Sequence, residues 1–237
     1  PKKPLLGGDD HDVGNYGTFL AFKEKHNKVY KDKTEEKARF GIFRDNMKKV
    51  RKIQEMEKGD ATYGASPFAD LTEAEFRENY LSPEWDLSYD PFLKPADIPT
   101  ETPPDAFDWR DHNAVTPVKN QGSCGSCWAF SVTGNVEGQW AIKKQELLSL
   151  SEQELVDCDK IDEGCNGGLP TNAYKEIIRI GGLESEKDYP YEGKDDKCEF
   201  VSKEAEAFIS GAVNISSNEE EMKAWLWKNG PISIGIN

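Results

Sequence analysis

The placement of the cysteines constrains this chain more than any other feature of its sequence. All five lie in the second half, at Cys124, Cys127, Cys158, Cys165 and Cys198, and the first 123 residues contain none. In an oxidising compartment an odd number of cysteines leaves one thiol outside the disulfides. The sequence thus predicts a first part without crosslinks and a second part in which two disulfides and one further thiol are available.

Cys127 lies where the glycine-rich loop 121–126 changes into an expected helix of about 17 residues that starts near Ser126. Backbone N–H groups and the helix dipole favour negative charge at such a position, so the thiol is suited to act as a nucleophilic thiolate. Gln121 lies on the same loop, and its side-chain amide could join the Cys127 N–H as a second donor to an oxyanion. The pattern therefore indicates acyl transfer at Cys127.

Three other interpretations of Cys124-x-x-Cys127 compete with this one. Many buried cysteines only fill space in a core. A zinc site needs four closely spaced ligands, but the other cysteines follow without a second tight pair. A thioredoxin-like redox pair needs a surrounding βαβ pattern, which is not evident here. We therefore expect no metal and no cofactor.

The charge balance argues against nucleic-acid and membrane partners. The chain has 30 basic and 44 acidic residues, which gives a formal net charge of −14. Such an excess of acid repels nucleic acid and anionic lipid. The apolar runs are too short for a membrane span. One sequon, Asn214-Ile215-Ser216, makes Asn214 a candidate glycosylation site and is compatible with the secretory route.

Composition and proline density divide the chain into four parts. Residues 1–13 form a polar tail, and 14–81 have helical patterning. Residues 82–104 contain six prolines, which exclude a helix and favour an extended linker. Residues 105–237 carry the cysteines.

The longest predicted helix of the first part runs from about Thr34 to Lys58. A slowly drifting stripe of residues at roughly helical spacing marks one face of it. The stripe consists of Glu35, Arg39, Phe43, Asn46, Val50 and Gln54. Within it, Glu35 and Arg39 are placed to form an i, i+4 ion pair.

Two further elements follow in the first part. We expect a short strand at 61–65 and then another helix, which either Asp70 or Thr72 caps.

The second part is predicted to contain further helices and a terminal strand. Ser151 and Glu154 have the spacing of a capping box at the start of one helix. Residues 164–170 form a glycine-rich loop, and Gly181 ends the helix that follows it. The last residues, GPISIGIN, are interpreted as a strand, so the chain is expected to stop inside an element.

Several of these segments resemble the papain-type cysteine proteases. The run QGSCGSCWAF contains a Cys-Gly-Ser-Cys-Trp signature of that family, and LSLSEQELVDCD, GCNGGLP and GGLESEKDYPYEG are similar to its first half. The stripe at 35–54 resembles the family's ERFNIN-type propeptide pattern. YGASPFAD resembles its GxNxFxD pattern at Gly64, Phe68 and Asp70, with Ser66 in place of Asn. These variants, together with SVTGNVEGQW and GGLPTNAY, are most similar to the cathepsin F group.

The resemblance implies an α+β, papain-like fold, mainly the α-rich left lobe with the right β lobe largely missing. It implies that 14–81 are a helical inhibitory prodomain, that 82–104 are the extended propeptide linker, and that 105–237 begin the peptidase domain.

The resemblance also implies roles for individual residues. Cys127 would be the nucleophile and Gln121 the oxyanion donor. The implied disulfides join Cys124 to Cys165 and Cys158 to Cys198. A strip for the backbone of an extended substrate and one wall of its apolar side-chain pocket would be formed by Asn166, Gly167, Gly168, Leu169 and Pro170. The propeptide motif residues would be Glu35, Arg39, Phe43, Asn46, Gly64, Phe68 and Asp70.

The histidines depart from the family pattern. His11, His26 and His112 all precede Cys127, whereas the family's catalytic His and Asn follow the cysteine by about 130–150 residues. We therefore expect both groups to lie outside this chain, and the chain by itself to turn over substrate poorly.

The predicted function is that of a latent cysteine endopeptidase precursor, acting on peptide or protein substrates and restrained by its own propeptide in cis. Cystatin-type inhibitors are expected partners, and the expected location is lysosomal or secreted. The alternative is a propeptide-like inhibitor of related proteases without activity of its own, but such a protein would not need Cys127 and Gln121.

Overall fold

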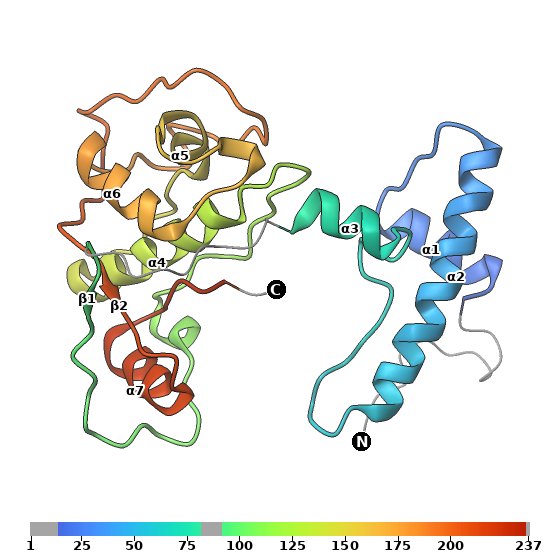
Figure 1. Ribbon diagram of the computed structural model, residues 1–237, viewed down its shortest axis with the longest axis horizontal. Coiled ribbons are helices and arrows are strands. Elements are labelled where there is room, and N and C mark those ends of the chain that lie inside the picture. The colour runs from blue at the N-terminus through green and yellow to red at the C-terminus, as the bar shows by residue number, and fades with distance from the viewer. Residues whose placement is uncertain (1–13, 82–91, 236–237) are drawn as a thin grey trace. The chain divides into compact units, whose positions relative to one another are not determined.

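The computed structural model describes residues 14–81 and 92–235, and the chain divides between residues 78 and 79 into two units (Figure 1). The predicted tail at 1–13, most of the first half of the linker and the last two residues lie outside the described ranges. No helix of the described residues has the length and apolar character needed to cross a membrane.

The described residues of the first unit contain the helices α1 (Tyr16–Lys25) and α2 (Lys33–Met56) and most of α3 (Glu73–Tyr80), whose last two residues follow the division. The Asp32 side chain accepts the N–H groups of Thr34 and Glu35, so α2 begins one residue before the predicted start and ends two before the predicted end. An aromatic core joins α1 to α2 and to the loop after α2. Its buried members are Phe19, Phe22, Phe43, Met47 and Ala69.

The strand predicted at 61–65 is wrong, because this segment forms no ladder in the structure. Its backbone groups instead bond to one side chain of the preceding helix. Gln54 donates to the Ala61 carbonyl over 3.2 Å and accepts the Tyr63 N–H over 2.8 Å. A local side-chain interaction thus takes the place of strand pairing in this segment.

The second unit is built around the long helix α4 (Cys127–Lys144), with α5 (Glu152–Cys158) and α6 (Pro170–Ile180) packed against it (Figure 1). Its core is formed by the inner face of α4 and by apolar residues of α5, α6 and the segments after them. As predicted, Gly181 ends α6 with a left-handed φ of 108°. Two 3₁₀ turns, η1 (Trp109–His112) and η2 (Gly164–Asn166), and the helix α7 (Glu219–Asn229) complete the helical elements of the described residues.

Regular strand structure is sparse among the described residues. β1 (Lys94–Pro95) pairs in parallel with β2 (Val213–Asn214), and the Ala96 N–H continues this pairing to the Asn214 carbonyl. The described part of the predicted linker is therefore extended and packs against the second unit. An ion pair between Glu101 and Lys228 attaches it further along.

The strand predicted for the last eight residues is also wrong as far as the structure describes them. Residues 231–235 form no ladder. Instead they bond to the side chains of α4: the Asn135 amide donates to the Pro231 carbonyl over 2.7 Å, and the Ser131 and Ser233 hydroxyls lie 2.6 Å apart. Alternating apolar residues form a strand only where a partner strand is present.

Candidate active site

The predicted nucleophile, Cys127, is the first residue of α4 and is partly exposed. It takes part in neither disulfide. Trp128 and Ala129, which follow it, are fully buried, so the first turn of the helix is fixed in the core. The start of α4 thus presents the Cys127 side chain on a rigid support.

Gln121 lies on the loop before this helix, as predicted, and its side chain closes the loop by donating to the Cys124 carbonyl over 2.9 Å. Tyr191 fastens the same loop from a distant part of the chain. Its hydroxyl donates to the Gln121 carbonyl over 2.8 Å and lies 2.5 Å from the Ser126 hydroxyl. Sequence reasoning did not assign Tyr191 a role, although it lies in the DYPYEG segment that resembles the family.

Both disulfides that the resemblance implies are present, joining Cys124 to Cys165 and Cys158 to Cys198. The first brings the glycine-rich loop of 164–169 beside the Cys127 loop. The Gly125 N–H donates to the Cys165 carbonyl over 2.8 Å. A side chain at position 125 is excluded, because its Cβ would lie 2.4 Å from that carbonyl oxygen.

The predicted substrate strip follows directly in this second loop. Asn166 is exposed, Gly167 is buried, and Gly168, Leu169 and Pro170 are partly buried. Gly168 lies flat against the Trp128 indole, since a Cβ there would be 2.6 Å from the ring. The Trp128 Nε1–H also donates to the Gly164 carbonyl over 3.1 Å. Trp128, the residue after Cys127, therefore packs against the predicted strip and holds its first residues in place.

A polar network lies beneath the other end of the Cys127 loop. The Lys119 ammonium contacts the buried carboxylates of Glu137 at 2.8 Å and Glu152 at 2.6 Å. A hollow of about 280 Å³ adjoins this network, and Phe130 and Tyr191 are among its lining residues, whereas Cys127 is not. The described residues contain no group of three or more His, Cys, Asp or Glu side chains placed to hold a metal ion.

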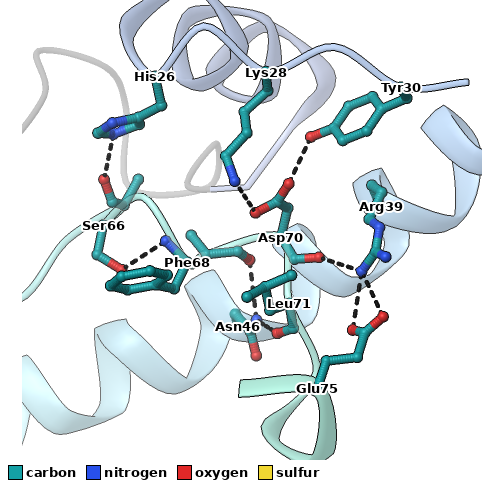
Figure 2. A network of polar contacts seen from close by, with 12 residues as sticks. His26, Lys28, Tyr30, Arg39, Asn46, Ser66, Phe68, Asp70, Leu71 and Glu75 are labelled. Atoms are coloured by element: carbon teal, nitrogen blue, oxygen red, sulfur yellow. Dashed lines mark hydrogen bonds and ion pairs between the residues drawn. The ribbon is translucent and has the colours of Figure 1, made fainter. Parts of the chain in front are cut away.

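In the first unit, two of the predicted propeptide motif residues, Arg39 and Asn46, bond to the backbone at and beside Asp70 (Figure 2). Asp70 is 2% exposed. Its carboxylate accepts the Tyr30 hydroxyl over 2.9 Å and forms an ion pair with Lys28 at 3.0 Å. Asn46 of α2 donates to the carbonyls of Ala69 and Leu71, on either side of Asp70.

Other motif residues have different surroundings. Phe43 is a core residue, and Phe68 is partly exposed with its ring edge-on to Phe76 at 5.2 Å. Gly64 has no neighbouring atom that would exclude a side chain. The Ser66 hydroxyl accepts the Phe68 N–H over 3.3 Å.

The predicted ion pair between Arg39 and Glu35 is present, but Arg39 also has a second and nearer acidic partner. Its guanidinium lies 3.9 Å from Glu35, but it donates to both carboxylate oxygens of Glu75 at 2.8 and 2.9 Å. Glu75 and Thr72 also form a reciprocal capping box at the start of α3, which decides between the two predicted caps in favour of Thr72. The Thr-x-x-Glu spacing was the sequence signal for Glu75.

Two described histidines have contacts away from the loop at 121–126. His26 lies 3.2 Å from the Ala65 carbonyl in the first unit. His112 stacks on Phe107 and contacts the Trp109 ring. Asn214, the predicted glycosylation site, is exposed in β2, and its modification stays a prediction.

Comparison with known proteins agrees with this arrangement. Residues 103–237 match the papain family cysteine protease model, and residues 19–76 match the cathepsin propeptide inhibitor domain (I29). This chain belongs to the papain family of cysteine proteases and carries the family's propeptide domain ahead of the peptidase domain.

Curated relatives and solved precursors share both domains. Cathepsin F of Mus musculus is 47% identical over 238 residues, which cover 99% of this chain and 52% of that protein. Cysteine proteinase 1 of Zea mays is 43% identical over 254 residues, covering 100% of this chain and 68% of its own length. The chain thus spans about half the length of the mouse relative.

Among solved structures, digestive procathepsin L 3 of Tenebrio molitor larval midgut superimposes with a TM-score of 0.79 at 34% identity. That match covers 90% of this chain and 70% of the other. The fold is therefore papain-like with a helical propeptide, as expected, and the few strands of the described residues fit the α-rich lobe. These matches favour the protease precursor over the alternative of a dedicated inhibitor.

Proposed function

We propose that the full-length protein is a latent cysteine endopeptidase that cleaves peptide bonds by attack of the Cys127 thiolate. The observation that carries this proposal is the position of Cys127. It begins a helix whose next two residues are buried, it lies outside both disulfides, and Gln121 is held on the same loop.

The chemistry follows from these groups. The Cys127 sulfur adds to the carbonyl carbon of the scissile peptide, and the carbonyl oxygen becomes an oxyanion that the Cys127 N–H and the Gln121 amide stabilise. The intermediate collapses to a thioester as the amine leaves with a proton from a histidine imidazolium. Water then hydrolyses the thioester, releasing the acid product and the thiol. Neither His26 nor His112 is assigned the proton-transfer role here.

Substrate binding is assigned to the loop beside Cys127. Asn166, Gly167 and Gly168 would pair with an extended substrate backbone, for which the absence of side chains at the glycines leaves room. Leu169 and Pro170 would form one wall of an apolar side-chain pocket. The exposed side of this loop and its disulfide to the Cys127 loop support the assignment.

The first unit would restrain the enzyme until it is removed, with 82–104 connecting it to the peptidase domain. The family's propeptide domain in the same chain supports this assignment. Cystatin-type inhibitors and a lysosomal or secreted location belong to the same proposal, which rests on the resemblance to cathepsin F proteins.

Site-directed labelling tests the proposal. The oxidised protein is treated with a peptidyl epoxide built on L-residues and with its D-residue isomer, and mass spectrometry locates and times the adduct. We expect an adduct at Cys127 that forms at least about tenfold faster with the L-isomer, because a peptide site must orient the probe. The variant Cys127→Ser is expected to form none.

Two outcomes of the labelling experiment would contradict the proposal. Equal rates for the two isomers would show an ordinary surface thiol rather than a peptide-binding nucleophile. Inhibition of a related protease by the intact protein, with no L-isomer preference at Cys127, would support the inhibitor alternative.

A further inference from the structure

A single hydroxyl group holds both ends of the loop that precedes the nucleophile. The loop runs from Gln121 to Ser126, directly before Cys127. The Tyr191 Oη lies 2.8 Å from the Gln121 carbonyl oxygen and 2.5 Å from the Ser126 Oγ. These two contacts fix the distance between the start of the loop and the start of α4.

The direction of both hydrogen bonds follows from the protons that are available. A carbonyl oxygen only accepts, so the Tyr191 hydroxyl donates its single proton to Gln121. The Ser126 hydroxyl therefore donates to the Tyr191 oxygen, since its other acceptor, the Cys124 carbonyl, is 3.5 Å away. Burial raises the pKa of Tyr191 above its ordinary value of 10, so the hydroxyl keeps its proton at neutral pH.

Ser126 supports this interpretation because its side chain does not act on the helix that it precedes. Ser126 is fully buried and occupies the cap position of α4, but its hydroxyl makes no capping bond there. A serine at this position commonly accepts an N–H of the first turn. Here the buried hydroxyl contacts Tyr191 instead, which places it in the loop rather than in the helix cap.

Tyr191 is itself held by residues outside the loop. Its N–H donates to the Glu186 carboxyl over 2.9 Å. The next two N–H groups, of Glu192 and Gly193, donate to the side-chain oxygen of Gln153 over 2.8 and 3.1 Å. Gln153 belongs to α5 and is 1% exposed. The core of the second unit therefore supports the Tyr191 hydroxyl.

The group that this hydroxyl places is the Gln121 amide. A primary amide has two N–H donors, and the bond to the Cys124 carbonyl at 2.9 Å occupies one of them. The proposed function assigns the other to the oxyanion. Such a donor acts only when it lies within about 2.7–3.1 Å of the oxygen, so a small shift of Gln121 weakens it.

We propose that Tyr191 is a positioning residue for acyl transfer at Cys127 and that it acts through Gln121. By joining both ends of the loop, its hydroxyl keeps the Gln121 amide at the distance that an oxyanion requires. Its effect is confined to a step that builds negative charge on a carbonyl oxygen. This inference rests on the proposed function of Cys127 and Gln121.

Two small probes separate this step from general reactivity of the Cys127 thiol. With para-nitrophenyl acetate the sulfur adds to the ester carbonyl carbon, the carbonyl oxygen becomes an oxyanion, and collapse expels nitrophenolate and leaves a thioester. Iodoacetamide alkylates the same sulfur by displacement of iodide, and no oxyanion forms. Mass spectrometry of the full chain locates and times both adducts. The ratio of acylation rate to alkylation rate cancels the ionisation and accessibility of the thiol.

Three single variants test the hydroxyl. Tyr191→Phe keeps the ring, which lies edge-on to Phe130 at 4.9 Å, and should lower the ratio about fivefold, the effect of one hydrogen bond. Ser126→Ala breaks the other bond of the same hydroxyl and should lower the ratio by a similar factor. Tyr189→Phe is the matched control, because that hydroxyl donates to Asp157, and it should leave the ratio unchanged.

A double variant shows whether Tyr191 acts through Gln121. Gln121→Ala removes the donor itself and should lower the ratio on the order of a hundredfold. Adding Tyr191→Phe to Gln121→Ala should then change the ratio by less than about twofold, because no amide is left to position. A further fivefold loss in the double variant would overturn the inference, since the hydroxyl would then act on the loop in general.

The single variants also distinguish failure of the inference from failure of the proposed function. If Gln121→Ala lowers the ratio and Tyr191→Phe lowers it no more than Tyr189→Phe does, the inference is overturned and the oxyanion role of Gln121 stands. If Gln121→Ala leaves the ratio unchanged, the oxyanion role is rejected and the inference fails with it.

Discussion

At the scale of single residues, Glu154 shows how burial can redirect a predicted contact. Ser151 caps α5 by accepting the Glu154 N–H over 2.9 Å, as the capping-box pattern predicts. A capping box also implies that the Ser151 N–H donates to the Glu154 carboxyl, and this part of the prediction is wrong. The Glu154 carboxyl instead accepts the N–H of Glu184, and the Ser151 N–H donates to the Glu184 carbonyl. Glu154 is fully buried, and burial raises its pKa to about 8.

This buried carboxyl makes stability depend on pH. Folded Glu154 keeps a proton that the unfolded chain releases above its ordinary pKa of 4.5, so stability falls as pH rises from there to about 8. Glu154→Gln keeps the acceptor without the charge. We expect it to stabilise the second unit by roughly 3 kcal/mol near pH 8 and to change little near pH 4.5.

The free energy of unfolding of the second unit is measured by urea unfolding followed by tryptophan fluorescence. The fluorescence reports on this unit because all six tryptophans follow residue 79. The control is Glu146→Gln, which alters an exposed side chain. A Glu154→Gln protein no more stable than the unmodified one near pH 8 would contradict the prediction.

At the scale of elements, one ion pair joins the long prodomain helix to the short one. Arg39 of α2 donates to both oxygens of Glu75 in α3, while Glu75 also accepts the Thr72 N–H over 2.8 Å. Arg39 further donates to the Asp70 carbonyl over 3.2 Å. The same two side chains therefore fix the loop that contains Asp70 and the start of α3.

The N–H of Thr72, the Thr72 hydroxyl and Arg39 lower the pKa of Glu75. Its contribution is therefore present above the ordinary pKa of 4.5 and is lost as pH falls through the lower folded value. We expect Glu75→Gln to destabilise α3 by about 1 kcal/mol near pH 7, with the difference fading in stronger acid.

Hydrogen exchange of residues 73–80 in the full chain checks this prediction. Glu73→Gln is the matched control, since Glu73 occupies the same helix turn and, among the described residues, its ion pair is with the exposed Arg77 at 3.4 Å rather than with Arg39. Equal effects of the two variants would show that the helix dipole, rather than the Arg39 contact, is responsible.

At the scale of the whole molecule, carboxyls with raised pKa values and carboxyls with lowered pKa values make stability depend on pH in two different windows. The second unit contains buried carboxyls whose burial raises their pKa, namely Glu152, Glu154, Asp162 and Glu186. In the first unit, hydrogen bonds lower the pKa of three carboxyls, Glu36, Asp45 and Glu75. Protonation of the buried carboxyls between about pH 8 and about pH 5 therefore favours the folded second unit. In stronger acid, stabilising contacts are lost from the first unit and also from the second, where the pKa values of four other carboxyls are lowered, namely Glu101, Asp108, Glu176 and Asp196.

The two effects have separate pH windows. From about pH 8 to about pH 5, protection from hydrogen exchange should increase in the second unit and stay constant in the first. Below about pH 4.5, protection should decrease in 16–56. Hydrogen exchange of the unmodified protein, measured from about pH 8 to below about pH 4.5, tests this prediction. A loss of protection in the second unit between about pH 8 and about pH 5 would contradict it.

The sequence alone determined the features that depend on local spacing. The helices α2, α4 and α6, the position of Cys127 at a helix start and the Ser151 cap of α5 follow from periodicity, caps and glycine placement, which act over a few residues. The expected strands at 61–65 and at the end of the chain failed because a strand needs partners from elsewhere, and here side chains of α2 and α4 take those backbone groups.

Only the tertiary structure decided which distant groups meet. Glu75 rather than Glu35 became the main partner of Arg39, and Tyr191 fastened the Cys127 loop across 70 positions of the chain. No periodicity encodes such contacts. They form when folding removes water from polar and charged groups, which then need a hydrogen-bonding partner from another part of the chain.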